Sequence, residues 1–122
     1  MKILFKPQTE WLPPQDFPDL SKYDEIAIDL ETKDPNLNKR MGSGSVVGEG
    51  DVVGISLATY DWCAYYPIAH EGGGNMDRKM VLKWLQDQLN TPATKIFHNA
   101  MYDVCWIRAL GLKINGKIVD TM

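Results

Sequence analysis

The sequence predicts a single α/β domain built on a mixed sheet. Apolar strand-like segments and amphipathic segments follow one another in the order strand, hairpin, helix, strand, helix, strand. A hairpin gives antiparallel pairing, whereas strands joined through a helix pair in parallel, so this order implies both kinds of pairing in one sheet. With 122 residues, 44% of them hydrophobic, the chain can bury one compact core and is too short for two.

The first strand is expected over Glu25 to Leu30, where apolar and polar residues alternate. Residues 1–24 precede it as an extended arm that contains too much proline for a helix or a central strand. We therefore divide the chain into this arm and a domain over residues 25–122. The large apolar residues of the arm are expected to hold it against the domain: Trp11, Leu12, Phe17 and Leu20.

A polar, glycine-rich loop is expected over Lys33 to Gly50. Its glycine spacing does not match a dinucleotide-binding motif, and the loop leads into a strand instead of a helix. A functional alternative is a lip beside the acidic residues described below, in which Lys33, Lys39 and Arg40 contact phosphate groups.

The next two strands, over Asp51 to Thr59 and Trp62 to Ile68, are apolar and β-prone. They are joined by the polar pair Tyr60-Asp61 and predict an antiparallel hairpin. A helix is expected from Met76 to about Leu89, with Asn75 as its N-cap. Its core-facing stripe is predicted to consist of Met80, Val81, Trp84, Leu85 and Leu89.

A fourth strand over Thr94 to Phe97 leads into a second helix from about Ala100 to Leu110. Asn99 is its expected N-cap, and Gly111 is expected to end it. The last segment, Lys113 to Met122, predicts a fifth strand entering a turn. The apolar side of the second helix is predicted to consist of Tyr102, Cys105, Trp106, Ala109 and Leu110.

Asp29 and Glu31 stand two residues apart at the end of the first strand, so their side chains project from the same side of it. Two carboxylates this close stay ionised when a cation lies between them, and hard oxygen ligands select Mg²⁺ or Mn²⁺. The pair therefore suits half of a two-metal site that cleaves phosphodiesters. The alternative is two solvated acids, since Asp-x-Glu occurs by chance in roughly every two or three chains of this length.

A second acidic position lies where the fourth strand runs into the second helix. Asp103 falls in the first turn of that helix, where the helix dipole favours an ionised carboxylate. Its alternative role is a stabilising helix-start charge without further function. His98 is a possible base or metal ligand, but a histidine that leads into a capped helix is more often structural.

With both acidic segments placed, the chain resembles the DEDD superfamily of 3′-to-5′ exonucleases, which share a ribonuclease H-like fold. DLET at 29–32 is similar to the first exonuclease motif of these enzymes, and FHNAMYDV at 97–104 is similar to the second. More narrowly, the segments WLPPQDFPDLS, IAIDLETKDPNL, GDVVGISLA and IVDTM resemble the start of the proofreading domain of phage DNA polymerases of family A. The resemblance covers essentially the whole chain.

The resemblance implies an enzyme that removes 3′-terminal nucleotides from DNA with two divalent metal ions, Mg²⁺ or Mn²⁺. In this family Asp29 would bridge both metals, Glu31 would hold the metal that activates water, and Asp103 would support the other metal. Thr32 and Asn99 lie where the family places residues near the 3′-terminal nucleotide. The implied partners are the single-stranded 3′ end of DNA and the remainder of the polymerase polypeptide or a complementing chain.

The third motif of the family, a Tyr followed four residues later by an Asp on a later helix, has no counterpart between Asp103 and Met122. The sequence is therefore expected to be an N-terminal piece of a larger polymerase or exonuclease, truncated before that helix and weakly active or inactive alone. Asp120 lies in a context that matches a structural strand end in the family, and it is not included in the predicted site.

The composition of the chain does not identify its binding partner. The net charge of −3 and the isoelectric point near 5.3 give no global basic surface for nucleic acid, although metals at an acidic site supply positive charge locally. The apolar start is too short for a signal peptide, and no segment approaches the ~18 apolar residues of a membrane span. A cytoplasmic protein is expected, in the host cytoplasm if a phage encodes it. Two alternatives stay open, an RNA-trimming relative and a non-catalytic nucleic-acid-binding or interaction module.

Overall fold

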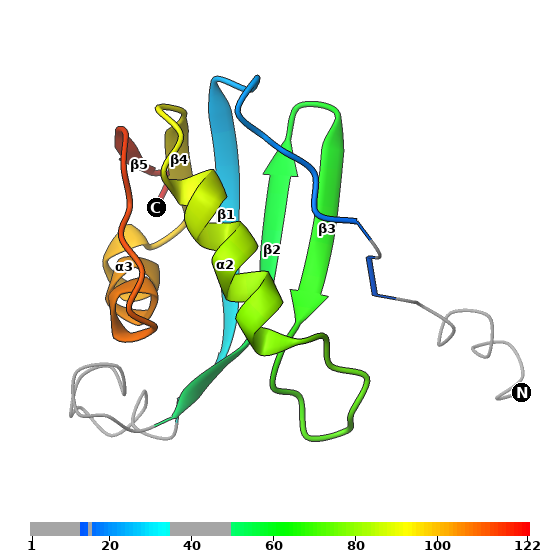
Figure 1. Ribbon diagram of the computed structural model, residues 1–122. Helices are drawn as coiled ribbons and strands as arrows, with labels where there is room; N and C mark the ends of the chain where they lie inside the picture. The colour runs from blue at the N-terminus through cyan, green and yellow to red at the C-terminus, as the bar shows by residue number, and fades with distance from the viewer. Residues whose placement is uncertain (1–12, 15, 35–49) are drawn as a thin grey trace, which may run out of the picture.

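A five-stranded mixed sheet forms the centre of the molecule (Figure 1). The structure is a computed structural model, and it describes residues 13–14, 16–34 and 50–122. Its elements are β1 (Glu25–Lys33), β2 (Asp51–Thr59), β3 (Trp62–Pro67), α2 (Arg78–Leu89), β4 (Thr94–Phe97), α3 (Ala100–Ala109) and β5 (Ile118–Asp120). The strand order is β3-β2-β1-β4-β5, with antiparallel pairing on the β2 side of β1 and parallel pairing on the β4 side. The mixed α/β sheet predicted from the sequence is confirmed.

The described strands follow the predicted order, but three of them differ in length, β3 only by ending one residue early at Pro67. β1 continues past Leu30 to Lys33, and its register with β2 shifts between Glu31 and Thr32, as in a β-bulge. The fifth strand is confined to β5, so the prediction of a strand from Lys113 was wrong in extent. Residues 113–115 bind the end of α2 instead, because the Gln86 side chain donates to the Lys113 carbonyl at 2.9 Å and the Asn115 N–H donates to the Leu89 carbonyl at 2.9 Å.

The start of α2 corrects the predicted N-cap. The helix begins at Arg78, and the carboxylate of Asp77 accepts hydrogen bonds from the N–H groups of Lys79 and Met80 at 2.9 and 3.2 Å. Asn75 lies outside the helix, where its side chain bonds to the main chain of His70. Both residue types cap helices well, and the hydrogen bonds of Asn75 to the His70 main chain within the loop decide between them.

The core lies between the sheet and the helices. In β1, Ile26, Ile28 and Leu30 are buried and the residues between them are more exposed, as the alternation predicted. In α2, four of the five predicted core residues are buried, whereas Met80 is 56% exposed. Met80 lies in the first turn of the helix. The buried residues of α2 are Val81, Trp84, Leu85, Gln88 and Leu89.

The described part of the proline-rich arm packs on the domain. The backbone N–H of Leu20 donates to the Gln88 side chain at 2.8 Å, and the Trp84 indole donates to the Pro18 carbonyl at 2.8 Å. Leu20 is buried, and Phe17 stacks on Tyr66 with ring centroids 5.6 Å apart. The predicted contacts of Trp11 and Leu12 lie outside the described residues, as does most of the loop that contains Lys39 and Arg40.

The ends of α3 are close to the prediction. Gly111 has a φ of +84°, and its N–H donates to the Arg108 carbonyl at 2.9 Å, so it ends the helix as expected. Asn99 stands at the N-cap position with a left-handed φ of 71°, a conformation that asparagine tolerates better than most residues. Its side chain makes no capping hydrogen bond, which corrects the predicted capping interaction. The apolar side was also misjudged in part, because Ile107 is buried and Ala109 is exposed.

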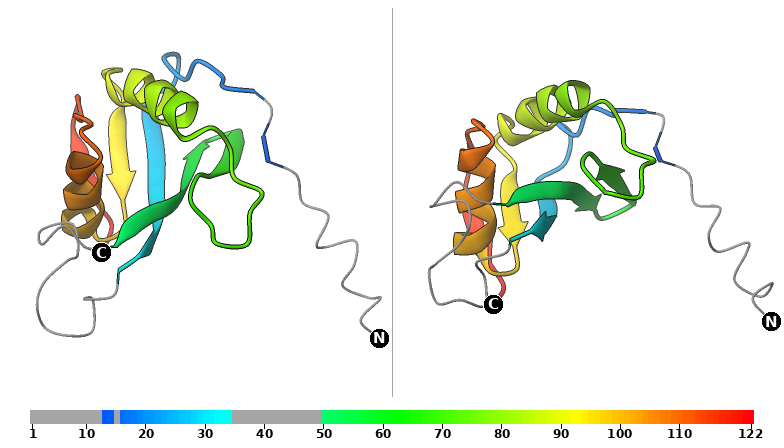
Figure 2. Two further views of the ribbon diagram at one scale, coloured as in Figure 1. Left: turned by 60° about the horizontal axis from the view of Figure 1, so that its bottom comes forward. Right: turned by 90° about the horizontal axis from the view of Figure 1, so that it is seen from below.

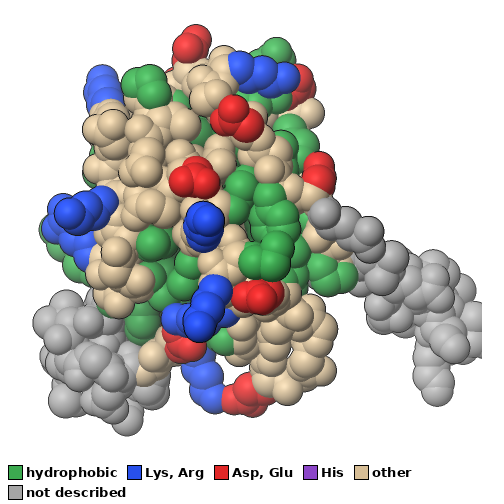
Figure 3. Space-filling view, in the orientation of Figure 1, with side chains coloured by type: hydrophobic (Ala, Val, Ile, Leu, Met, Phe, Trp, Pro, Cys, Tyr) green, Lys and Arg blue, Asp and Glu red, His purple; other side chains and the backbone are tan. Residues whose placement is uncertain are grey.

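Both described helices belong to one face of the sheet. Right-handed crossovers from β3 through α2 to β4, and from β4 through α3 to β5, run in the same direction across the strand order and so place both helices on one side. Figure 2 shows α2 lying over the strands, and Figure 3 shows basic and acidic side chains interspersed on this face. No helix in the described part of the chain is long and apolar enough to cross a membrane.

Candidate functional site

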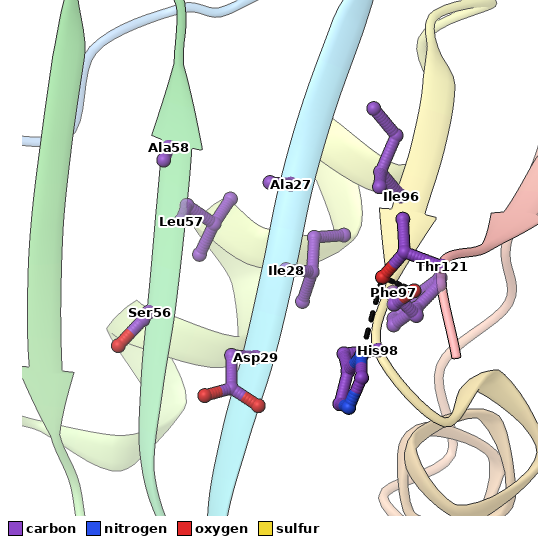
Figure 4. Close-up of a pocket in the computed structure, with 10 residues that line it drawn as sticks. All are labelled: Ala27, Ile28, Asp29, Ser56, Leu57, Ala58, Ile96, Phe97, His98 and Thr121. Atoms are coloured by element: carbon purple, nitrogen blue, oxygen red, sulfur yellow. Dashed lines mark hydrogen bonds between the residues drawn. The ribbon is translucent and has the colours of Figure 1, made fainter.

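A shallow pocket of about 290 Å³ lies on the sheet face opposite α2 (Figure 4). Its floor is built from small and apolar residues that pair across three strands, Ala58 on β2, Ala27 on β1 and Ile96 on β4. Asp29 and His98 lie at one end of this floor, with α2 behind the strands. The pocket thus joins an apolar surface to an acidic strand end.

Asp29 and Glu31 project from the open face of β1, as their spacing predicted. Both side chains are exposed, while their neighbours Ile28 and Leu30 point into the core. Across the sheet Asp29 pairs with Ser56 on β2, and Glu31 pairs with Gly54. The small partner Ser56 leaves room beside Asp29, where both residues line the pocket, whereas the ring of Tyr65 on β3 lies over Gly54.

Asp103 on α3 reaches the same strand from the side of β4. Its side chain is 3% exposed, and the Leu30 backbone N–H donates a hydrogen bond to its carboxylate. Its second oxygen, Oδ2, is buried with no hydrogen-bond partner among the described residues. Burial, together with the charges of Asp29 and Asp120, raises the pKa of Asp103 to about 7, against the opposing effect of the Leu30 N–H. The prediction that the helix dipole keeps this carboxylate readily ionised was wrong, because burial and neighbouring charge outweigh the dipole.

The carboxylates fit a divalent cation in their chemistry, although they do not enclose one. Within the described residues, no three Asp, Glu, His or Cys side chains converge closely enough to hold a metal ion. The unpartnered Oδ2 of Asp103, buried within electrostatic range of Asp29, is nonetheless the kind of group that a cation would satisfy. Asp29 and Asp103 therefore form the centre of the candidate metal site, with Glu31 on the same face of β1.

Glu31 has partners that the sequence analysis missed. The Tyr65 hydroxyl on β3 lies 3.1 Å from Glu31 Oε2 and 2.5 Å from His70 Nε2. Burial and the adjacent Glu31 carboxylate raise the pKa of Tyr65 to about 12, so its hydroxyl keeps its proton. His70 is half-buried in this contact. The signal in the sequence is Gly54, a glycine in the middle of an apolar strand.

A second hydrogen-bond network ties β1 to α3. The Thr32 and Tyr102 hydroxyls lie 2.7 Å apart, and the Tyr102 hydroxyl also donates to Asp34 at 3.1 Å. Because Tyr102 has a single hydroxyl proton, which it donates to Asp34, the Thr32 hydroxyl donates to Tyr102. Tyr102 packs against the core as predicted, and its hydroxyl also links the predicted substrate-binding residue Thr32 to α3.

The start of α3 is held by Asp120. Asp120 Oδ1 accepts from the Asn99 N–H at 2.9 Å and from the Met122 N–H at 3.0 Å, and the bond from Met122 is the main cause of its lowered pKa. These bonds suit a structural role at the strand end. His98 is exposed, with Nδ1 3.3 Å from Thr121 Oγ1, and it borders the pocket instead of packing in the core. Asn99 is exposed beside it, and its predicted contact with substrate stays a prediction.

Comparisons with known proteins agree with this architecture. The chain is 31% identical over 109 residues to a DNA-directed DNA polymerase of Pseudomonas phage M6, a match that covers 86% of the chain and 16% of the polymerase. The structure superimposes on the EXO domain of Nibbler from Aedes aegypti with a TM-score of 0.58 and 18% identity, covering 85% of this chain and 46% of that one. The chain shares the fold of that EXO domain. No family model matches it.

The exonuclease-type fold and the similarity to a phage polymerase confirm the resemblance predicted from the sequence. The chain spans about a sixth of the polymerase that it matches. The predicted roles of Asp29, Glu31, Asp103, Thr32 and Asn99 stay predictions, for which the geometry above supplies the physical case.

Proposed function

We propose that this chain forms part of a 3′-to-5′ proofreading exonuclease that hydrolyses 3′-terminal phosphodiester bonds of DNA with two divalent metal ions. The observation that carries the proposal is the buried Asp103 carboxylate, with its unpartnered oxygen, beside Asp29 at the end of β1. A buried acid near a second acid is costly for a protein without a cation to compensate it. The similarity to a phage DNA polymerase supports DNA as the substrate and a polymerase polypeptide in the cytoplasm of the host as the setting.

In this proposal Asp29, Glu31 and Asp103 hold the metal ions. Bound Mg²⁺ or Mn²⁺ would supply positive charge for the attacking and leaving oxygens of the phosphodiester. Thr32, fixed by Tyr102, would contact the terminal nucleotide together with Asn99. The overall acidity of the chain is compatible with this chemistry, because the metals bring the positive charge that the phosphates require.

Metal binding is the first test of the proposal. Mn²⁺ titrated into the 122-residue chain should bind, and Asp29→Ala and Asp103→Ala should each weaken binding, measured by calorimetry or by the electron paramagnetic resonance of free Mn²⁺. Asp61→Ala, which removes an exposed acid from the hairpin turn, is the matched control. Equal binding by Asp29→Ala and the unaltered chain would contradict the proposal.

Activity requires a chain that reaches the third motif. A polypeptide extended past that motif should release mononucleotides from the 3′ end of labelled single-stranded DNA in Mg²⁺ or Mn²⁺, and Asp29→Ala should abolish release. The same assay on RNA of identical sequence separates the proposed activity from that of an RNA-trimming relative. Binding of DNA without any release, in the extended protein, would point to a non-catalytic module.

A further inference from the structure

We propose that Tyr65, held by His70, is a positioning residue that fixes the orientation of the Glu31 carboxylate. The inference rests on the proposed function, in which Glu31 is a metal ligand. It concerns residues of β3 and of the following loop, outside both acidic motifs.

Counting protons sets the direction of the two hydrogen bonds. The Tyr65 hydroxyl lies 3.1 Å from Glu31 Oε2 and 2.5 Å from His70 Nε2. An ionised carboxylate can only accept, and a tyrosine hydroxyl has one proton, so this proton goes to Glu31. His70 must then donate from Nε2. One carboxylate oxygen of Glu31 is thus engaged by the protein, and no hydrogen bond from the described residues reaches Oε1, which is left for a ligand.

The sheet provides the room for this contact. Tyr65 pairs with Ser56 on β2, whereas Glu31 pairs with Gly54, so the tyrosine ring must cross diagonally over Gly54 to reach the carboxylate. A Cβ atom at position 54 would lie 1.8 Å from the Tyr65 hydroxyl oxygen. Glycine weakens a strand interior, and here a close approach of a side chain requires it.

The loop after β3 is tied down so that His70 stays in place. Asn75 Oδ1 accepts from the His70 N–H at 2.7 Å, and Asn75 Nδ2 donates to the His70 carbonyl at 2.9 Å. Next to His70, Glu71 forms an ion pair with Lys33 at the end of β1. The loop is therefore closed on itself by Asn75 and joined to β1 by Glu71.

An oriented carboxylate binds a cation better than a freely rotating one. Fixing a glutamate side chain costs conformational entropy. The Tyr65 hydrogen bond would fix Glu31 before the metal binds, so this entropy loss would not reduce the metal affinity. Groups that orient a metal ligand typically change metal affinity by roughly 10–100-fold. We therefore expect Tyr65→Phe, which removes a single oxygen, to weaken Mn²⁺ binding about tenfold.

The matched control is the neighbouring tyrosine. Tyr66 points to the opposite face of β3, and its hydroxyl bonds to the Asp16 carbonyl at 3.1 Å. In Mn²⁺ titrations of the 122-residue chain, Tyr66→Phe should bind as the unaltered chain does. His70→Ala should weaken binding like Tyr65→Phe, and His70→Gln should restore part of it, because the glutamine amide can donate to the tyrosine.

Two results separate this inference from the proposed function. Loss of binding in Asp29→Ala with unchanged binding in Tyr65→Phe would overturn the role of Tyr65 and leave the metal site standing. A second readout needs no metal: side-chain couplings of Glu31 measured by nuclear magnetic resonance should show one rotamer in the unaltered chain and in Tyr66→Phe, and averaging in Tyr65→Phe. Averaged couplings in the unaltered chain would overturn the inference even if no metal binds.

Discussion

Asp103 illustrates how burial and local charge compete at a single residue. A helix dipole stabilises an anion in the first turn by about 0.3–1 kcal/mol. The shift of the Asp103 pKa from 3.8 to about 7 corresponds to roughly 4 kcal/mol against the charged form. Burial and the charge of Asp29 therefore win, and the metal-free protein holds this carboxyl partly protonated near neutral pH.

The first prediction concerns pH and stability without metal. The folded pKa of Asp103 is raised above its unfolded value, so its contribution to stability is fully present below pH ~4 and is lost as the pH rises through about 7. We expect the contribution of Asp103 to the free energy of unfolding to fall by a few kcal/mol over this window, measured by urea unfolding with a chelator present. Asp103→Asn is the control and should lack this component of the pH dependence. The same pH profile for both proteins would contradict the assignment.

The second prediction separates stability from function at the same residue. At pH 8, without metal, Asp103→Asn should be more stable than the unaltered chain, because it removes an uncompensated buried charge. With Mn²⁺ present the order should reverse, since the variant has lost a ligand. Thermal unfolding with and without Mn²⁺ measures both effects. A variant that is less stable under both conditions would mean that the carboxyl is mainly structural.

At the scale of elements, two structural details depend on contacts from outside the element. The helix α2 starts at Arg78 because Asp77 caps it, although Asn75 offers the same chemistry. The strand β2 tolerates Gly54 because the ring of Tyr65 crosses that position. In both cases local propensity permits several outcomes and a tertiary contact selects one.

The third prediction tests the cap of α2. Asp77→Ala should lower the free energy of unfolding by about 1 kcal/mol, because two helix N–H groups lose their acceptor. Asp87→Ala removes the same charge from an exposed position within α2 and should have little effect or a slightly stabilising one. Chemical denaturation of the three proteins makes the comparison. Equal losses in both variants would show that charge, and not capping, is responsible.

The fourth prediction tests the close approach at Gly54. Gly54→Ala should destabilise the protein by about 1–3 kcal/mol, because the added methyl group displaces the ring of Tyr65. The same substitution in a Tyr65→Ala background should cost much less, since the obstacle is gone. A double-mutant cycle of unfolding free energies measures this coupling. Additive effects would exclude the steric conflict.

At the scale of the whole molecule, the open face of the sheet carries Asp29 and Glu31, whereas Asp103 is buried on α3. Both helices lie on the other face, so the pocket floor of Ala27, Ala58 and Ile96 is covered by no described helix. Asp29 lies at the end of this floor. Residues that complete a hydrolytic site could approach Asp29 from this side without disturbing the core.

The fifth prediction concerns the activity of the 122-residue chain alone. Hydrolysis depends on holding the attacking water in line, and displacement of the reacting groups by about 1 Å costs on the order of 100-fold in rate. Because no Tyr-x-x-x-Asp follows Asp103 in these residues, we expect at least that loss relative to a polypeptide extended past the third motif. Release of 3′-terminal mononucleotides from labelled DNA measures it. Robust release by the short chain that disappears in Asp29→Ala would mean that its own residues complete the site.

The sequence by itself determined the order of the elements and the acidic motifs. Alternation in β1 placed Asp29 and Glu31 on one face, and Gly111 ended α3 as predicted. Periodicity and turn chemistry are local, so they can be read from neighbouring residues. The similarity to a phage polymerase and the exonuclease-type fold agree with the motif-based resemblance.

The tertiary structure alone decided how the site is tuned. The raised pKa of Asp103 comes from burial and from Asp29 on another element, and the partner of Glu31 lies 34 residues away on β3. Asn75 holds the loop in which His70 contacts Tyr65. Because Asn75 bonds to His70, it does not cap α2 as the sequence suggested. Desolvation and hydrogen-bond partners depend on distances between residues that are remote along the chain, and no local pattern encodes those distances.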